Sequence, residues 1–339
     1  MTDSTIHDRA LAAFQGLAIG DALGMPTQSM SLQQIREDHG RITGFVDAGP
    51  RQRIAHGMPA ASITDDTEQA VLVARLLVEG NGRLDPTRFA EALVDWERGM
   101  AAKGSLDLLG PSTKTAVQRI LDGVPVSEAG STGTTNGAAM RITPVGITTT
   151  ADDLDVLVDA VQDASRVTHD TGLGIAGASA IAAAVSAGID GASRAEALAV
   201  AVAAARIGER RGHWIAGASI ADKTAWARGW LPTVPAPDRV TAIDGVIGTS
   251  VASQESVVAA LALVSLDLDP WETLCTAAST GGDTDTIAAM AGAVLGAVHG
   301  ASAWSSEAVA RVESVNDIRF AEVVSPLLGL RLNSATSSH

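Results

Sequence analysis

Two short clusters of acidic and hydroxyl residues carry the side chains with the most specific chemistry. The first is Thr64, Asp65 and Asp66, and the second is Asp283, Asp285 and Thr286. Each cluster directly precedes a segment rich in Ala and other apolar residues, so each is expected at the N-terminal end of a helix. One carboxylate at such a place is explained as a helix cap that also interacts with the helix dipole. Four carboxylates shared between two helix ends are more than capping requires.

The acidic clusters predict a metal site. If the two helices pack side by side, their four carboxylates converge and repel one another. Hard divalent cations such as Mg²⁺ and Mn²⁺ prefer carboxylate, hydroxyl and water oxygens, and they neutralise such a cluster. A pair of these ions, about 3.5–4 Å apart and bridged by one Asp, is a common arrangement in hydrolases.

The elements that must position these residues are predicted to be helices, so the fold class is all-α. The apolar periodicity predicts helices over residues 8–23, 66–79, 86–100, 112–121, 152–166, 173–187, 194–207, 253–266, 270–279 and 284–299. Irregular segments are expected at residues 25–63, 123–144 and 229–239. No change in composition divides the chain, so residues 1–332 are expected to form one domain, followed by a flexible tail at 333–339.

Glycines spaced four residues apart predict close helix packing at two places. The two trios are Gly16, Gly20 and Gly24, and Gly292, Gly296 and Gly300. Because a helix has 3.6 residues per turn, each trio forms a smooth stripe along one helix face. Gly costs about 1 kcal/mol in a helix interior, so two stripes indicate that close helix packing is needed.

Composition excludes several classes of function. The formal net charge is −15, which argues against a nucleic-acid-binding surface. The polar, acidic N-terminus is no signal peptide, and the apolar segments 172–189 and 287–298 are expected to be too weak or too short to cross a membrane. With Cys275 as the single cysteine, no intramolecular disulfide is possible, and a cytoplasmic location is expected. The sequence assigns no oligomeric state.

Five motifs stand in the order and approximate spacing of a known family. They are GLAIGDALG (16–24), TDDT (64–67), NGAAMR (136–141), VTH (167–169) and GGDTDT (281–286). Over about residues 9–300 the chain resembles the ADP-ribosylglycohydrolases, which include the dinitrogenase-reductase-activating glycohydrolase and the ADP-ribosyl-acceptor hydrolases. The resemblance implies a single all-α domain with two Mg²⁺ or Mn²⁺ ions. It also implies hydrolysis of the glycosidic bond at the ribose of an ADP-ribosylated protein or small molecule.

The resemblance implies ligand sets for the two ions and a set of substrate contacts. One ion would be bound by Thr64, Asp65, Asp66 and Asp285, and the other by Asp283, Asp285 and Thr286, with Asp285 as the bridge. The implied substrate-binding residues are Gly110, Ser112, Asn136, Gly137 and His169. Independently of the family, a Gly/Thr-rich loop before a helix, such as residues 133–137, can bind phosphate through backbone N–H groups. Arg141 is interpreted as a structural ion-pair partner.

Gln28 departs from the family pattern. The family has Glu at this position, where it is thought to gate the cleft or act as a base. Gln cannot accept a proton near neutral pH, so Asp65 or Asp283 becomes the candidate proton acceptor, and Gln28 stays a candidate catalytic-site residue. The segments GDALGMP and LLGPSTK resemble a bacterial branch associated with smaller ribosides.

Three functions remain open from the sequence. The first is hydrolysis of an ADP-ribosylated protein or small molecule, and the second is hydrolysis of a small N-riboside. The third is a non-catalytic binding or structural role on the same scaffold, against which the complete set of metal ligands argues. Arg51 and Arg53, in the long segment 25–63, could donate to a diphosphate and so favour the first.

Overall fold

The computed structural model describes residues 3–102 and 110–336, and this part of the chain is helical without β-strands. The helices of the first half are α1 (Asp3–Gly24), α2 (Leu32–Asp38), α3 (Asp65–Glu79), α4 (Pro86–Ala102), α5 (Pro111–Leu121), α6 (Val126–Ala129), α7 (Gly137–Met140), α8 (Thr143–Thr148) and α9 (Leu154–His169). Those of the second half are α10 (Gly172–Ile189), α11 (Arg194–Gly208), α12 (Ile220–Trp230), α13 (Arg239–Ala242), α14 (Ser253–Val264), α15 (Pro270–Ala277), α16 (Thr284–His299), α17 (Ser306–Asn316) and α18 (Phe320–Thr336). The all-α prediction is confirmed.

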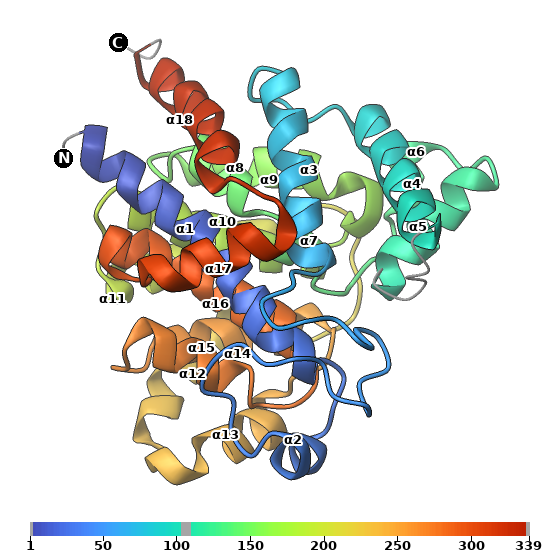
Figure 1. The fold of residues 1–339 in the computed structure, drawn as a ribbon. Coiled ribbons are helices and arrows are strands. Elements are labelled where there is room, and N and C mark those ends of the chain that lie inside the picture. Colours follow the sequence, from blue (N-terminus) through green and yellow to red (C-terminus); the bar gives the residue numbers. More distant parts are fainter. Residues whose placement is uncertain (1–2, 103–109, 337–339) are drawn as a thin grey trace.

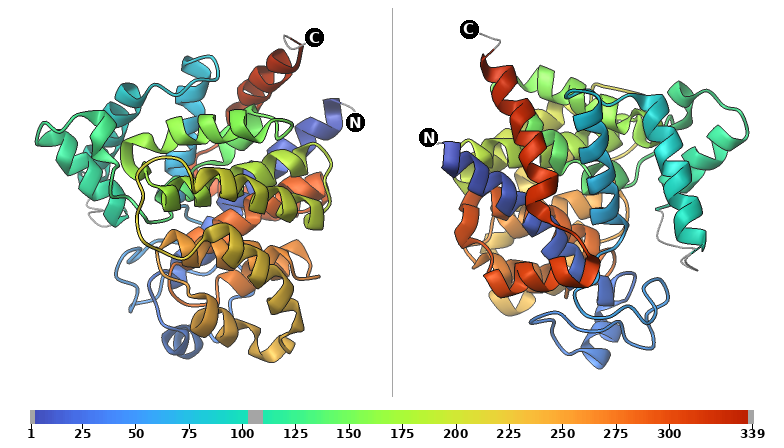
Figure 2. Two further views of the ribbon diagram at one scale, coloured as in Figure 1. Left: turned by 180° about the vertical axis from the view of Figure 1, so that it is seen from behind. Right: turned by 45° about the horizontal axis from the view of Figure 1, so that its top comes forward.

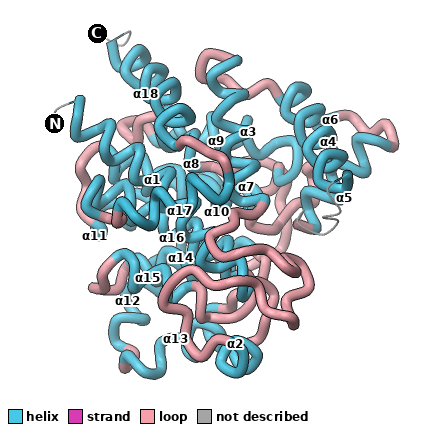
Figure 3. Tube along the Cα trace, in the orientation of Figure 1, coloured by secondary structure: helices cyan, strands magenta, loops and turns pink. Residues whose placement is uncertain are grey.

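The helices form one compact body, with α1 and α16 crossing its middle and α10 packed behind them (Figures 1 and 2). Helices α4, α5 and α6 form a lobe on one side. The N-terminal end of α1 and the C-terminal end of α18 lie on the same side of the molecule. A long loop, residues 39–64, connects α2 to α3 (Figure 3).

Some element boundaries differ from those expected. Helix α2 lies inside the segment 25–63 that was expected to be irregular, because Ser31 and Gln34 form a capping box that starts it. Helix α12 was not predicted; its N-cap residue is Ser219, whose hydroxyl accepts a hydrogen bond from the backbone N–H of Asp222 (3.0 Å). Helix α18 continues to Thr336, so four residues of the segment expected as a tail are helical, and residues 337–339 lie outside the described part.

Each glycine stripe packs closely against another helix, as predicted, and the structure shows that the two stripes lie on helices that pack against each other. A Cβ atom built on Gly20 would lie 2.1 Å from the carbonyl oxygen of Ala288, and one on Gly16 would lie 2.1 Å from that of Gly292. One on Gly24 would lie 2.4 Å from the Cα of Asp285. Since the residue numbers run in opposite directions along the two helices, α1 and α16 are antiparallel and in backbone contact. The stripe therefore brings the C-terminal end of α1 against the acidic N-terminal end of α16.

Gly20→Ala is expected to lower the free energy of unfolding by about 3 kcal/mol, because the new methyl group must push α1 away from α16. Urea unfolding monitored by circular dichroism measures this. Gly329→Ala, in the exposed face of α18 with no atom within 4 Å of the new Cβ, is the matched control and should gain up to about 1 kcal/mol. Equal effects of the two substitutions would show that the stripe is not under packing constraint.

Helix α10 corrects one expectation about membranes. Within the described residues it is the one helix long and apolar enough to cross a bilayer, with a mean hydropathy of 1.7. All of its residues are nevertheless buried inside the protein, which is the pattern of a core helix.

Candidate metal centre

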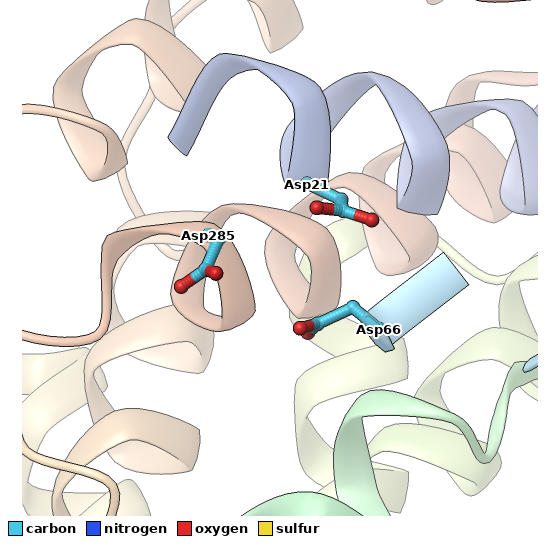
Figure 4. A group of neighbouring side chains, drawn as sticks. All are labelled: Asp21, Asp66 and Asp285. Atoms are coloured by element: carbon cyan, nitrogen blue, oxygen red, sulfur yellow. The ribbon is translucent and has the colours of Figure 1, made fainter. Parts of the chain in front are cut away.

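Three helix ends meet at one point of the fold, and each brings a buried aspartate. Asp21 comes from the last turn of α1, Asp66 from the first turn of α3 and Asp285 from the first turn of α16 (Figure 4). One carboxylate oxygen of each lies within 4.8 Å of the others. The two acidic clusters of the sequence therefore converge, as expected for a shared metal site.

A glycine turn places the second cluster. Gly281 and Gly282 have φ angles of +80° and +72°, a left-handed conformation that residues with a side chain rarely adopt. The backbone N–H of Gly282 donates to the carbonyl of Met30 (2.9 Å), and that of Asp283 donates to the carbonyl of Thr249 (2.7 Å). The turn is thus held from both sides, and it presents Asp283 and Asp285 to the helix ends.

Capping does not explain either cluster. Thr64 and Asp283 stand at the N-cap positions of α3 and α16, yet neither side chain makes a capping hydrogen bond with a backbone N–H of its own helix. Instead Asp21, from another helix, accepts hydrogen bonds from the backbone N–H groups and hydroxyls of both Thr64 and Thr67, at 2.5–3.2 Å. Asp21 of α1 therefore caps α3. The carboxylates of α3 and α16 do not cap their own helices and are available to bind a ligand.

The carboxylates are electrostatically unfavourable without a cation. Burial raises the pKa of Asp21 to about 6, against the opposing effect of its four donors. Burial raises the pKa values of Asp65, Asp66 and Asp285 well above their usual range, and the neighbouring carboxylates raise them further. Burial also raises the pKa of Asp283, which remains partly exposed at the mouth of the cluster.

The cluster fits a hard divalent cation. The Oδ1 atoms of Asp66 and Asp285 are buried and have no hydrogen-bond partner among the described residues. Buried acceptors of this kind are rare in folded proteins unless an ion or water fills them. The hydroxyls of Thr64 and Thr286 lie 3.3 and 3.4 Å from Asp66 Oδ2, so the donor set consists of oxygens alone. Both oxygens of Asp21 are already filled by the threonine donors, so Asp21 supports the site instead of offering a free ligand atom.

The residues that were expected to bind substrate have different roles in the structure. The amide of Asn136 donates to Ser256 Oγ (2.8 Å) and to Asp283 Oδ2 (2.5 Å), so it holds a carboxylate of the cluster. Gly137 is required for packing, because a Cβ there would lie 2.9 Å from the His169 ring. Ser112 accepts a hydrogen bond from the Thr135 backbone (3.4 Å), and Gly110 is half-buried at the start of α5.

His169 and Arg141 are both buried and engaged. The ring nitrogens of His169 are hydrogen-bonded to the hydroxyls of Thr168 and Thr135, and burial holds its pKa well below the usual value. The expected ion pair of Arg141 is replaced by neutral partners, since its guanidinium donates to Gln69 Oε1 (2.7 Å) and Thr168 Oγ1 (2.5 Å). It also lies over the Phe89 ring. Burial lowers the pKa of Arg141 to about 9.

Gln28 is buried next to the glycine turn. Its backbone carbonyl accepts a hydrogen bond from Gln52 Nε2 (3.0 Å). The backbone N–H of the following residue, Ser29, donates to the backbone carbonyl of Gly282 (2.7 Å). The side-chain Nε2 of Gln28 has no partner among the described residues. In the long loop, the exposed Arg51 is paired with Glu37 and Asp38, so it is not a free donor for a diphosphate.

Two residues of the site were not singled out from the sequence, Asp21 and Gln69. Asp21 is the one charged residue in the apolar part of α1, residues 10–24, which carries the first glycine stripe, and that contrast could have identified it. Gln69 lies one turn after Asp65 and donates to its Oδ2 (3.2 Å) while accepting from Arg141. The role of Gln69 could not be predicted from the sequence, because it depends on Arg141, which is distant in the chain.

Comparison with known proteins identifies the family of this chain. Residues 2–334 match the family model described as ADP-ribosylglycohydrolase. The uncharacterized protein YegU of Escherichia coli (strain K12) is 35% identical over 92% of this chain and 94% of its own length. The ADP-ribosyl-(dinitrogen reductase) glycohydrolase of Rhodospirillum rubrum is 32% identical over 50% of this chain and 54% of its own length.

A solved structure shares the fold. A chain described as an ADP-ribosylglycohydrolase-related protein complex superposes with a TM-score of 0.70, at 24% identity, and the match covers 98% of this chain and 99% of that one. The sequence motifs, the family model and the relatives of similar length lead to one conclusion. This chain belongs to the ADP-ribosylglycohydrolase family and is a glycosyl hydrolase.

Proposed function

We propose that this enzyme uses two Mg²⁺ or Mn²⁺ ions to hydrolyse the bond at the anomeric carbon of the ribose in an ADP-ribosylated substrate. The observation that carries the proposal is the pair of buried, unpartnered oxygens on Asp66 and Asp285 where three helix ends meet. A purely structural cluster of this kind would be a net cost to the fold, since burying unpaired charge is expensive.

The proposed ligand sets follow the two clusters. The first ion would be held by Thr64, Asp65, Asp66 and Asp285, and the second by Asp283, Asp285 and Thr286. When bound, such ions supply positive charge that orients ribose hydroxyls and lowers the pKa of water. Asp21 and Asn136 orient the ligand residues, through Thr64 and Asp283 respectively.

We assign the proton acceptor to Asp283 in preference to Asp65. Asp283 is partly exposed, whereas Asp65 is almost wholly buried and held by Gln69. A carboxylate at the mouth of the cluster can reach a water that attacks the anomeric carbon. The buried carboxylates behind it stabilise the positive charge that develops on the sugar in an oxocarbenium-like transition state.

The proposed substrate is an ADP-ribosylated protein or a small ADP-ribosyl compound, acted on in the cytoplasm. One relative is named for acting on ADP-ribosylated dinitrogen reductase, which supports the protein substrate. Gln28 supports a second candidate, a small N-riboside, because an unpartnered neutral amide beside the cluster can bind a polar leaving group. A non-catalytic role does not explain why buried carboxylate oxygens of Asp66 and Asp285 are left without hydrogen-bond partners among the described residues.

An activity panel tests the proposal. Purified protein with Mg²⁺ or Mn²⁺ is offered ADP-ribosylated arginine and serine peptides and a set of ribosides, and release of ADP-ribose or ribose is measured. Metal-dependent turnover of any ADP-ribosyl substrate supports the first candidate, and turnover of ribosides alone supports the second. No metal-dependent turnover across the panel would refute both.

Gln28→Glu is expected to lower kcat/KM on the true substrate by about tenfold or more. The substitution removes an amide donor and adds a negative charge beside the carboxylates, and a lost hydrogen bond to substrate is worth about 1–2 kcal/mol. Gln28→Met, which removes the amide and adds no charge, is the control that separates the lost hydrogen bond from the added charge. A Gln28→Glu enzyme that gains rate on ADP-ribosyl peptide and loses none elsewhere would contradict this expectation.

A further inference from the structure

A buried arginine with neutral partners lies behind the metal centre. Arg141 stands at the C-terminal end of α7 and is 1% exposed, so it carries a positive charge into the core. Its guanidinium donates to Thr168 of α9 and to Gln69 of α3, and it lies over the ring of Phe89 of α4. None of these partners is a carboxylate. A buried charge is costly unless a charge of opposite sign lies near it, so we looked for one beyond the direct partners.

Gln69 connects Arg141 to a carboxylate of the metal centre. Its Oε1 accepts a hydrogen bond from Arg141 (2.7 Å), and its Nε2 donates to Asp65 Oδ2 (3.2 Å). Gln69 is fully buried and Asp65 is 6% exposed, so little water screens this connection. Burial lowers the pKa of Arg141, and the Asp65 charge opposes that effect, so the two charges attract each other across the amide. The opposite charge is therefore that of a proposed metal ligand.

Donor and acceptor chemistry allows one orientation of this amide. Arginine can only donate and an ionised carboxylate can only accept, so the oxygen of Gln69 faces Arg141 and its NH₂ group faces Asp65. The reverse orientation would place donor against donor and acceptor against acceptor. A glutamate at position 69 would repel Asp65, and an apolar residue would leave hydrogen-bonding groups of both neighbours without a partner. The side chain at this position must therefore offer one acceptor and one donor, as an amide does.

We propose that Gln69 is a positioning residue of the metal centre, which holds Asp65 in place as a metal ligand and is itself fixed by Arg141. Because its oxygen already accepts from Arg141, Gln69 does not bind the ion directly. Its N–H group restricts the rotation of the Asp65 carboxylate, and hydrogen bonds of this kind to ligand residues raise metal affinity. This inference rests on the proposed function in one respect, namely that Asp65 binds a cation. It does not depend on which substrate is hydrolysed.

Titration calorimetry with Mn²⁺ tests the positioning role without any substrate. Gln69→Met, which is close in size and removes both hydrogen bonds, is expected to weaken the affinity for at least one of the two ions about tenfold or more. Gln118→Met is the matched control, because the exposed Gln118 also donates to an aspartate one helical turn away, Asp122 (2.9 Å). The control should leave both affinities unchanged.

Thermal unfolding in EDTA separates positioning from a purely structural role. If Gln69 only stabilises the fold, Gln69→Met will lower the melting temperature in EDTA but leave the Mn²⁺ affinities of the folded protein unchanged. That combination would overturn the proposal. A weakened Mn²⁺ affinity, measured well below the melting temperature of the variant, supports it.

A measurement on the wild type keeps the proposal testable if Gln69→Met does not fold. In ¹H–¹⁵N spectra, the side-chain amide signals of Gln69, assigned through their connection to the backbone, should shift when Mg²⁺ is added, because the carboxylate to which they donate becomes a metal ligand. The amide signals of Gln118 should not move. Gln69 signals that stay in place while Mg²⁺ binds would show that Gln69 is not coupled to the metal centre, and the proposal would then be wrong.

The outcomes separate this inference from the proposed function. A wild-type protein that binds Mn²⁺ but hydrolyses neither ADP-ribosyl substrates nor ribosides would refute the proposed function, and a weakened Mn²⁺ affinity in Gln69→Met would still support the role of Gln69. Unchanged Mn²⁺ affinities in Gln69→Met would overturn that role even in an active ADP-ribosyl hydrolase. A wild type that binds no Mn²⁺ would overturn both.

Discussion

Asp285→Asn will abolish hydrolysis and, in the presence of a chelator, make the protein more stable than wild type. Asp285 is the proposed bridge between the two ions, so its loss removes transition-state stabilisation worth several kcal/mol, or at least about a thousandfold in rate. In the metal-free protein the same carboxylate is buried among like charges that raise its pKa, and a neutral amide relieves that repulsion. The substitution therefore has opposite effects on function and on metal-free stability.

The measurement is kcat/KM with Mg²⁺ or Mn²⁺, together with thermal unfolding in EDTA at neutral pH. Asp152→Asn, at an exposed position outside the cluster, is the matched control and should change neither quantity. If Asp285→Asn keeps more than a small fraction of the activity, the bridging role is wrong. If it lowers the melting temperature in EDTA, the carboxylate is held by partners other than a metal.

Chelation will lower the melting temperature of the wild-type protein by about 5 °C. A cation that binds only the folded form at a hundred times its Kd contributes about 2.7 kcal/mol, and a domain of this size shifts by about 2 °C per kcal/mol. Differential scanning fluorimetry with Mg²⁺ and then excess EDTA measures this, and Asp285→Asn should show little or no shift. Identical curves for wild type with and without EDTA would count against a structured metal centre.

The pH dependence of the metal-free protein should have a definite sign. The folded-state pKa of Asp21 is raised to about 6, and those of Asp65, Asp66 and Asp285 are raised well above the usual range, so the folded form binds more protons than the unfolded form. In EDTA the stability should therefore fall as the pH rises from about 4 through 6 and beyond. Excess Mg²⁺ should reduce this loss, because cations replace the protons.

The all-α fold and the two acidic clusters followed from the sequence because they depend on local patterns. Apolar periodicity and Ala content indicate helices, and the glycine stripes at residues 16–24 and 292–300 indicate close packing of two of them. Helix α2 shows the limit of this reasoning, since it is a short helix that a capping box starts inside a Gly- and Pro-rich segment. The family motifs likewise need only the order and identity of residues.

Tertiary structure alone decided how the site is held. Asp21 caps a helix whose N-cap residue, Thr64, lies 43 positions further along the chain. His169 is hydrogen-bonded between Thr168, which accepts from Arg141, and Thr135. Such partners are distant in sequence and are brought together only when α1, α3, α7, α9 and α16 pack. The direction of a buried hydrogen bond also depends on every donor and acceptor around it, so no single segment specifies it. Local sequence determined which chemistry is present, and packing determined which atoms remain free to perform it.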